Sequence, residues 1–154
     1  MKVIFLDFDG VLNCAEWMKN VNRQQYLSMF EKDKEELDPV RVKMISDFAL
    51  EFDASIVISS SWRILCSLKI LTDLLRIRGL DERVAVIDVT PRSSSGFRGS
   101  EVEQWLKETH HTVESHVIFD DDGDFHPDQP LVKTTWDSGL EQHHIDKARE
   151  ILSK

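Results

Sequence analysis

The sequence predicts an α/β fold, in which a mainly parallel sheet is covered by helices on both faces to form a three-layer sandwich. Two observations predict it. Short apolar runs alternate with stretches of helical periodicity, and polar residues follow directly after several of these runs. The chain has 154 residues, of which 41% are hydrophobic, so it can bury one sizeable core. We therefore expect a single domain over residues 1–154.

Five short runs are expected to form the strands. Each is rich in β-branched or aromatic residues and is bounded by polar ones. They are residues 2–6 (KVIFL), 56–58 (IVI), 84–87 (VAVI), 116–119 (HVIF) and 131–135 (LVKTT). Because helical segments lie between them, right-handed crossovers should make neighbouring strands parallel.

Four helices are expected between and after these strands. They span residues 39–52, about 67–78, a segment from about residue 100, and about 142–152. Asp38 is a suitable N-cap for the first because Pro39 follows it at the first helical position. Gly79 is suited to end the second in a left-handed conformation.

Charge and composition exclude several classes of protein. The net charge of −9 makes the surface a poor general attractor of nucleic acid or anionic lipid. The chain has no apolar run long enough for a membrane span, and its start, MKVIFLDFDG, is not a signal peptide. Two cysteines, Cys14 and Cys66, suggest neither a disulfide framework nor a zinc site. We expect a cytoplasmic protein with no membrane partner.

Polar side chains gather where the predicted strands end, which is where ligands bind in open α/β sheets. The strand ends deliver Asp7, Asp9, Ser59, Ser60, Ser61, Asp120, Asp121, Asp122 and Asp124, and the loop at 88–99 adds Arg92 and Arg98. Several carboxylates at one edge repel one another unless a cation neutralises them, and an all-oxygen set suits Mg²⁺. Serine and arginine beside that metal would bind phosphate. The pattern predicts Mg²⁺-assisted phosphoryl transfer.

Four motifs in order resemble those of the haloacid dehalogenase (HAD) superfamily. DFDGVLN at residues 7–13 resembles its first motif, Ser59 its second, Arg98 its basic third and Asp120-Asp121 its acidic fourth. The strings ISSSWR, VTPR and RGSEVxxWL further resemble the compact HAD domain of RNA-repair proteins, which is distantly similar to the phosphatase domain of polynucleotide kinase-phosphatases. The resemblance implies a HAD-like, Rossmannoid fold.

The first motif carries the chemistry that this resemblance implies. Asp7 would be the nucleophile that forms an aspartyl-phosphate, and Asp9 would be the general acid and base. Two residues apart on an extended chain, both side chains would flank one phosphorus. Gly10 permits the turn that follows and is grouped with the residues expected to bind substrate. Asp7, Asp9, Asp120 and Asp121 are the expected ligands of Mg²⁺, with Asp124 as an alternative.

The other motifs supply the expected contacts to the substrate. Ser59 would donate to a phosphoryl oxygen, with Ser60 as the alternative, while Ser61 would cap the helix before Trp62. Arg98 would neutralise the nucleophile and bind phosphate, with Arg92 competing for the role. Arg63 would bind substrate or else lie solvated on a helix face. Trp62, Trp105 and Trp136 are expected in the core, whereas Trp17 is a candidate for stacking on a base.

The segments at 14–37 and 88–99 are too short for the full cap domain that larger HAD proteins insert there. An open site favours a phosphomonoesterase for a phosphorylated nucleic-acid end or nucleotide. The negative charge keeps a small-metabolite phosphatase as an alternative, and a non-hydrolytic phosphoacceptor module or a phosphotransferase are others. Because the chain has no kinase P-loop, separate RNA or DNA repair enzymes are possible partners. The sequence leaves the oligomeric state open.

Overall fold

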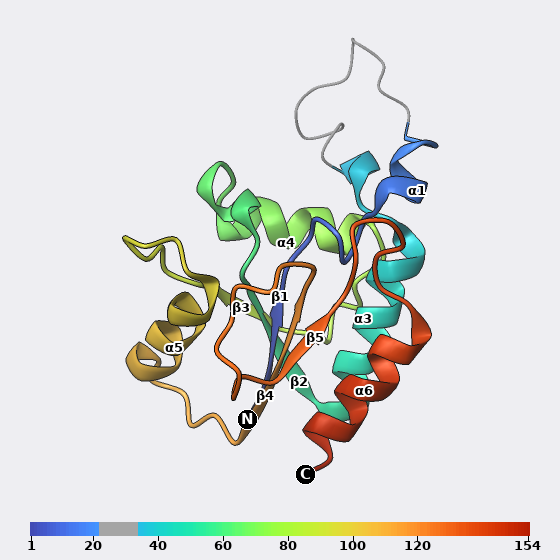
Figure 1. The fold of residues 1–154 in the computed structure, drawn as a ribbon. Helices are drawn as coiled ribbons and strands as arrows, with labels where there is room; N and C mark the ends of the chain where they lie inside the picture. Colours follow the sequence, from blue (N-terminus) through green and yellow to red (C-terminus); the bar gives the residue numbers. More distant parts are fainter. Residues whose placement is uncertain (22–33) are drawn as a thin grey trace.

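The structure is a computed structural model that describes residues 1–21 and 34–154. Its sheet contains β1 (Lys2–Leu6), β2 (Ala54–Ile58), β3 (Val86–Val89), β4 (Ser115–Asp120) and β5 (Leu131–Lys133). The strands lie in the order β3-β2-β1-β4-β5, and every neighbouring pair is parallel (Figure 1). The predicted α/β class is confirmed.

The register of the central strands brings three motifs to one edge of the sheet. Leu6, the last residue of β1, pairs with Ile58 on β2 and with Phe119 on β4. The next backbone hydrogen bonds extend this register: the Asp7 amide donates to the Phe119 carbonyl at 3.0 Å, and the Ser59 amide donates to the Leu6 carbonyl at 2.9 Å. Asp7, Ser59 and Asp120 therefore leave the sheet side by side.

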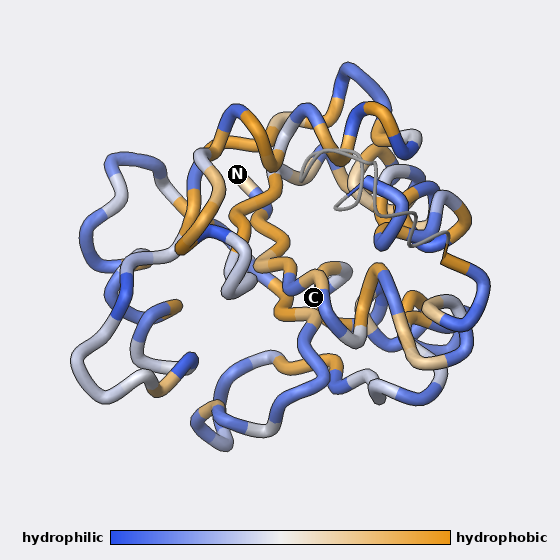
Figure 2. The backbone as a smooth tube through the Cα atoms, turned by 90° about the horizontal axis from the view of Figure 1, so that it is seen from above, coloured by the Kyte–Doolittle hydropathy of each residue, from blue (hydrophilic) through white to orange (hydrophobic). Residues whose placement is uncertain are grey.

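Helices cover both faces of the sheet. On one face, α3 (Pro39–Phe52), α4 (Leu68–Ile77) and α6 (Gln142–Leu152) pack on alternate strand residues such as Ile4 and Ile56. On the other, α5 (Arg98–Glu108) packs Val102 and Trp105 on Val3 and Phe5. Viewed from above, the hydrophobic strands run through the middle of the molecule (Figure 2). The two clusters are the two cores of a three-layer sandwich.

Most helix boundaries agree with the sequence analysis. Asp38 caps α3 by accepting from the Val40 amide, and α6 spans the expected residues. Ser67 caps α4, and Gly79 follows that helix with a φ of +115°. Helix α5 begins at Arg98, slightly before the expected start, because Asp124 accepts hydrogen bonds from its first amides.

The third and fifth strands differ from the prediction. The third was expected at 84–87 but is Val86–Val89. Val84 is buried in the larger cluster, so its hydrophobicity reflects packing of the preceding loop and not strand pairing. The fifth strand ends at Lys133; the Thr134 amide still donates to the Asp120 carbonyl at 3.0 Å, and the Thr134 hydroxyl donates to the Gly10 carbonyl.

Two short helical elements lie near the carboxyl edge: α1 (Ala15–Met18), which the sequence analysis did not predict, and a 3₁₀ helix, η1 (Ser61–Ile64), where a helix was expected to begin at Trp62. Residues 90–97 join β3 to α5 as a loop, with no domain inserted there. The other segment expected to be too short for a cap domain, residues 14–37, includes residues 22–33, which lie outside the described residues. Across the described ranges, no helix is both long enough and apolar enough to cross a bilayer.

Candidate active site

Three carboxylates meet at the carboxyl edge of the sheet. One oxygen from each of Asp7, Asp120 and Asp121 lies within 4.8 Å of the others. Asp7 follows β1 directly and Asp120 is the last residue of β4, so the register of these two strands places them together. The side chains of Asp7 and Asp120 are almost fully buried.

Burial in this cluster makes ionisation unfavourable. It raises the pKa of Asp7 well above its ordinary value, and the neighbouring Asp120 charge raises it further. Burial also raises the pKa of Asp120 to about 6 and raises that of Asp121. Because negative charge is in excess and every ligand is oxygen, the cluster fits a hard divalent cation such as Mg²⁺.

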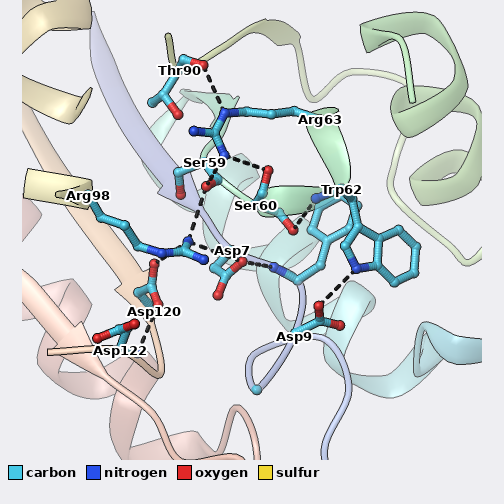
Figure 3. A network of polar contacts seen from close by, with 12 residues as sticks. Asp7, Asp9, Ser59, Ser60, Trp62, Arg63, Thr90, Arg98, Asp120 and Asp122 are labelled. Atoms are coloured by element: carbon cyan, nitrogen blue, oxygen red, sulfur yellow. Dashed lines mark hydrogen bonds and ion pairs between the residues drawn. The ribbon is translucent and has the colours of Figure 1, made fainter. Parts of the chain in front are cut away.

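Arg98 is the cation that the cluster already contains (Figure 3). Its Nη1 lies 3.0 Å from Asp120 Oδ2 and 3.6 Å from Asp7 Oδ1, and it donates to the Ser59 carbonyl at 3.2 Å. Arg92, its competitor, is exposed and lines a cavity of about 180 Å³ that Arg98 also borders. The geometry therefore favours Arg98 for the third-motif role.

Ser59 presents an unused hydroxyl beside these charges. Its side chain is 3% exposed, and its Oγ has no hydrogen-bond partner in the part of the chain that the structure describes. A buried hydroxyl without a partner is costly, and a phosphoryl oxygen would supply the missing acceptor. Ser60, by contrast, caps η1 by accepting from the Trp62 amide. The prediction that Ser61 is this cap was wrong, because η1 begins at Ser61 itself.

Arg63 holds together the backbone segments that border the site. Its five N–H groups donate to the carbonyls of Ser59, Ser60, Thr90 and Pro91 and to Glu101 Oε2, the last at 2.7 Å. The side chain is 6% exposed, so the alternative of a solvated helix face was wrong. No N–H group remains for a substrate phosphate, and the geometry gives Arg63 a structural role instead of the predicted contact with substrate.

Gly10 is required both by the turn and by its neighbour. Its φ is +79°, and an added Cβ would collide with the carboxylate of Asp121. The predicted turn is confirmed. The sequence analysis also grouped Gly10 with substrate-binding residues, whereas its structural role is to leave room for a carboxylate of the cluster.

Asp9 lies beside the cluster without joining it. Strand β1 ends at Leu6, so Asp7 and Asp9 do not share the extended chain on which the sequence analysis placed them. Asp9 Oδ1 accepts from Asn13 Nδ2 at 2.9 Å, and Oδ2 accepts from Trp62 Nε1 at 3.0 Å. Its carboxylate is not part of the three-carboxylate group, so its role as a metal ligand stays a prediction.

The carboxylates in the acidic loop after β4 have different contacts. Asp124 accepts from the amides of Arg98 and Gly99 and so fixes the start of α5 instead of joining the carboxylate group. Asp122 is exposed, and its amide donates to Asp120 Oδ1 at 2.9 Å. Asp120 and Asp121 are therefore the better candidates for metal binding.

Sequence reasoning assigned no role to Asn13 and Glu101 and expected Trp62 in the core, but all three shape the site. Each lies in one of the motifs that carry the resemblance to HAD proteins. A side chain with a hydrogen-bonding group inside such a motif was the feature that could have indicated a role in the site. Trp136, expected in the core, is 45% exposed, because β5 ends before it. Trp17 donates from Nε1 to the Glu35 carbonyl, and its stacking on a base stays a prediction.

Residues 3–145 match the family described as the HAD domain in Swiss Army Knife RNA repair proteins. The chain belongs to this family. No curated protein and no solved structure shows significant similarity to it. The HAD domain makes it a phosphatase-type hydrolase, and HAD domains generally use Mg²⁺, for which the cluster of Asp7, Asp120 and Asp121 offers ligands.

Proposed function

We propose that this HAD domain is a Mg²⁺-dependent phosphomonoesterase that works through a phosphoryl intermediate on Asp7. One observation carries the proposal: the unpartnered hydroxyl of Ser59 is buried beside the carboxylates and Arg98. Donors for a phosphate, a nucleophile and ligands for a cation therefore meet at one edge of the sheet. That combination is what hydrolysis of a phosphate monoester requires.

In the first step, an oxygen of Asp7 attacks phosphorus and the bond to the leaving oxygen breaks. Asp9 gives its proton to that oxygen, while Ser59 and Arg98 donate to the non-bridging oxygens. Bound between Asp7, Asp120 and Asp121, Mg²⁺ would supply charge neutralisation for the carboxylates and the phosphoryl group. In the second step, water attacks phosphorus, Asp9 takes its proton, and the Asp7 carboxylate is released.

We further propose that the substrate is a phosphorylated nucleic-acid end or nucleotide. The RNA-repair context of the family supports this, and so does the direct loop from β3 to α5, which inserts no domain over that side of the site. The net charge of −9 instead favours a small phosphorylated metabolite, which is the second candidate. If the substrate is a nucleic-acid end, separate repair enzymes would be the partners, and the setting would be cytoplasmic.

The test measures phosphate release with Mg²⁺ or with EDTA, for wild type and Asp7→Asn. The substrates are 3′- and 5′-phosphorylated oligonucleotides, mononucleotides, sugar phosphates and phosphopeptides. We expect turnover that needs both Mg²⁺ and Asp7 and is concentrated on oligonucleotide ends or nucleotides. Asp122→Asn, which changes an exposed carboxylate in the same acidic loop, is the matched control and should keep its activity.

Two outcomes would contradict parts of this proposal. Turnover concentrated on one sugar phosphate would replace the nucleic-acid substrate by a metabolite. Equal phosphate release by wild type and Asp7→Asn would overturn the mechanism, and an Asp7 acyl-phosphate stable for minutes would indicate a phosphoacceptor module instead.

A further inference from the structure

The carboxylate of Asp9 is held by two neutral donors from different parts of the chain. Trp62 Nε1, in η1, donates to Oδ2 at 3.0 Å, and Asn13 Nδ2 donates to Oδ1 at 2.9 Å. Figure 3 shows the Asp9 side chain turned toward the indole of Trp62. With one donor on each oxygen, the carboxylate has a defined position and a defined rotation.

Both donors are themselves fixed. The Trp62 ring packs edge-on against Phe8, which is fully buried, with the ring centroids 5.3 Å apart. The Trp62 amide donates to the capping hydroxyl of Ser60, which anchors the start of η1. On the other side, Asn13 Oδ1 accepts from the Gly10 amide at 3.0 Å. The position of Asp9 is thus set by the turn after β1 and by the helical turn after β2.

The two donors leave acceptor positions open on the Asp9 carboxylate. A carboxylate has about four acceptor positions, two on each oxygen. Trp62 and Asn13 take one on each oxygen, and among the residues that the structure describes no other donor takes the second position on either oxygen. Neutral donors also add no positive charge that would compete with the substrate.

We propose that Trp62 is the positioning residue for proton transfer by Asp9, and that its indole N–H lets the enzyme expel alkoxide leaving groups such as a ribose hydroxyl. The inference rests on the proposed function and deepens it. As the bond from phosphorus to the leaving oxygen breaks, the electron pair stays on that oxygen, which takes the Asp9 proton. Hydrolysis of the Asp7 intermediate then returns a proton from water to Asp9. A misplaced Asp9 would leave the alkoxide without its proton.

The chain contains a matched indole–carboxylate pair away from the site. Trp105 Nε1, on α5, donates to Asp88 Oδ2, on β3, at 2.7 Å. Trp105 packs in the smaller core against Phe5, and neither it nor Asp88 belongs to the carboxylate cluster. Trp105→Phe therefore removes an indole–carboxylate hydrogen bond and leaves the contacts of Asp9 unchanged, which makes it the control for Trp62→Phe.

The experiment compares two esters that share an aromatic ring, p-nitrophenyl phosphate and benzyl phosphate. Nitrophenolate leaves without a proton, whereas benzyl alkoxide needs one. Because kcat/KM covers the steps up to loss of the leaving group, its ratio between the two esters reports proton donation. We expect Trp62→Phe to lower kcat/KM about tenfold or more for benzyl phosphate and less than about threefold for p-nitrophenyl phosphate.

Asp9→Asn should show the same preference for p-nitrophenyl phosphate, and Trp62→Phe should add little in the Asp9→Asn background, because both act on one proton transfer. Trp105→Phe should leave the ratio of the two esters at its wild-type value. Thermal unfolding checks that Trp62→Phe is folded. If it is not, benzothienylalanine at position 62 is the substitute variant, because it keeps the bicyclic shape and replaces the N–H with sulfur.

Equal losses for both esters, or full additivity with Asp9→Asn, would overturn the inference and make Trp62 a packing residue. A failure of the proposed function looks different, since Asp7→Asn would then hydrolyse both esters as fast as wild type. The two failures are therefore distinguishable in one set of assays.

Discussion

Two arginines reach the carbonyl of Ser59, and they differ in how their charge is balanced. Arg63 faces one carboxylate, Glu101, and each of its N–H groups has an acceptor. Arg98 faces Asp7 and Asp120, with Asp121 close by, and its side chain is 22% exposed. The charge of Arg63 is matched by one carboxylate and its hydrogen bonds are complete. The carboxylates around Arg98 carry more negative charge than this arginine neutralises, although both arginines line the same cavity of about 180 Å³.

The difference separates support from chemistry. A buried pair with matched charge and complete hydrogen bonds fixes the loops that it joins, but it has nothing left to offer a ligand. A cluster with excess negative charge, beside a Ser59 hydroxyl that has no partner among the described residues, has groups left with which to bind a cation and a phosphate. The following four experiments test this contrast, from the largest expected effect to the smallest.

Removing the guanidinium of Arg63 should mainly affect stability. In Arg63→Ala, Glu101 stays buried without its cation, which should lower the free energy of unfolding by about 3–5 kcal/mol. Chemical denaturation measures this directly. Arg83→Ala is the control, because Arg83 forms an exposed pair with Asp81 whose loss should change stability by about 1 kcal/mol or less. Equal effects of the two variants would contradict the structural role of Arg63.

Removing the guanidinium of Arg98 should mainly affect turnover. Arg98→Ala loses a donor to the phosphoryl group and the partner of Asp7, so kcat should fall by about a hundredfold, or about 2.7 kcal/mol. Phosphate release and denaturation are measured on the same samples with Mg²⁺ present. The contrast between the arginines would be reversed if Arg98→Ala kept its turnover and lost as much stability as Arg63→Ala.

Mg²⁺ should stabilise the protein through the acidic cluster. At a Mg²⁺ concentration ten times its Kd, the gain in unfolding free energy should be about 1.4 kcal/mol, seen as a rise in Tm. Asp121→Asn should weaken this response, whereas Asp122→Asn should keep it, since Asp122 lies outside the carboxylate group. A wild-type Tm that does not respond to Mg²⁺ would argue against the metal site.

The smallest effect concerns His116, near the opposite end of the strand that carries Asp120. Burial lowers the pKa of His116 from its usual 6.5, so the folded protein binds fewer protons there than the unfolded chain does. This contribution to stability should therefore be fully present above the usual pKa of about 6.5 and should decrease as the pH is lowered below it. His116→Phe, which keeps a ring against Phe5, should flatten this slope. An unchanged slope would show that other groups set it.

The sequence was sufficient for the fold and for the main cluster, for a physical reason. Apolar runs that end together at Leu6, Ile58 and Phe119 bring the residues after them to one edge, whatever the loops between them do. Alternation of strands and helices therefore predicted that Asp7, Ser59 and Asp120 would meet. The loop at 88–99 supplied Arg92 and Arg98 as candidates, and the resemblance to HAD proteins, confirmed by the family match, pointed to Arg98.

What the sequence did not reveal are hydrogen bonds between side chains on different elements. The pairing of Arg63 with Glu101 depends on how η1 lies against α5, and no periodicity encodes that. The cap of η1 was misplaced by one residue because a 3₁₀ turn begins sooner than expected. Trp62 was expected in the core because tryptophan is hydrophobic. The sequence does not show that its indole N–H donates to the carboxylate of Asp9.

The central place of β1 also bears on how the protein is made. As the chain leaves the ribosome, β1 emerges well before its neighbour β4, which follows only after β2, β3 and, among the described residues, the helices α1, α3, η1, α4 and α5. Asp7 is therefore made long before Asp120, and strand pairings so distant in sequence form slowly. The acidic cluster of Asp7, Asp120 and Asp121 is complete only once β1 and β4 have paired, so the order of the strands delays its assembly until most of the sheet has been made.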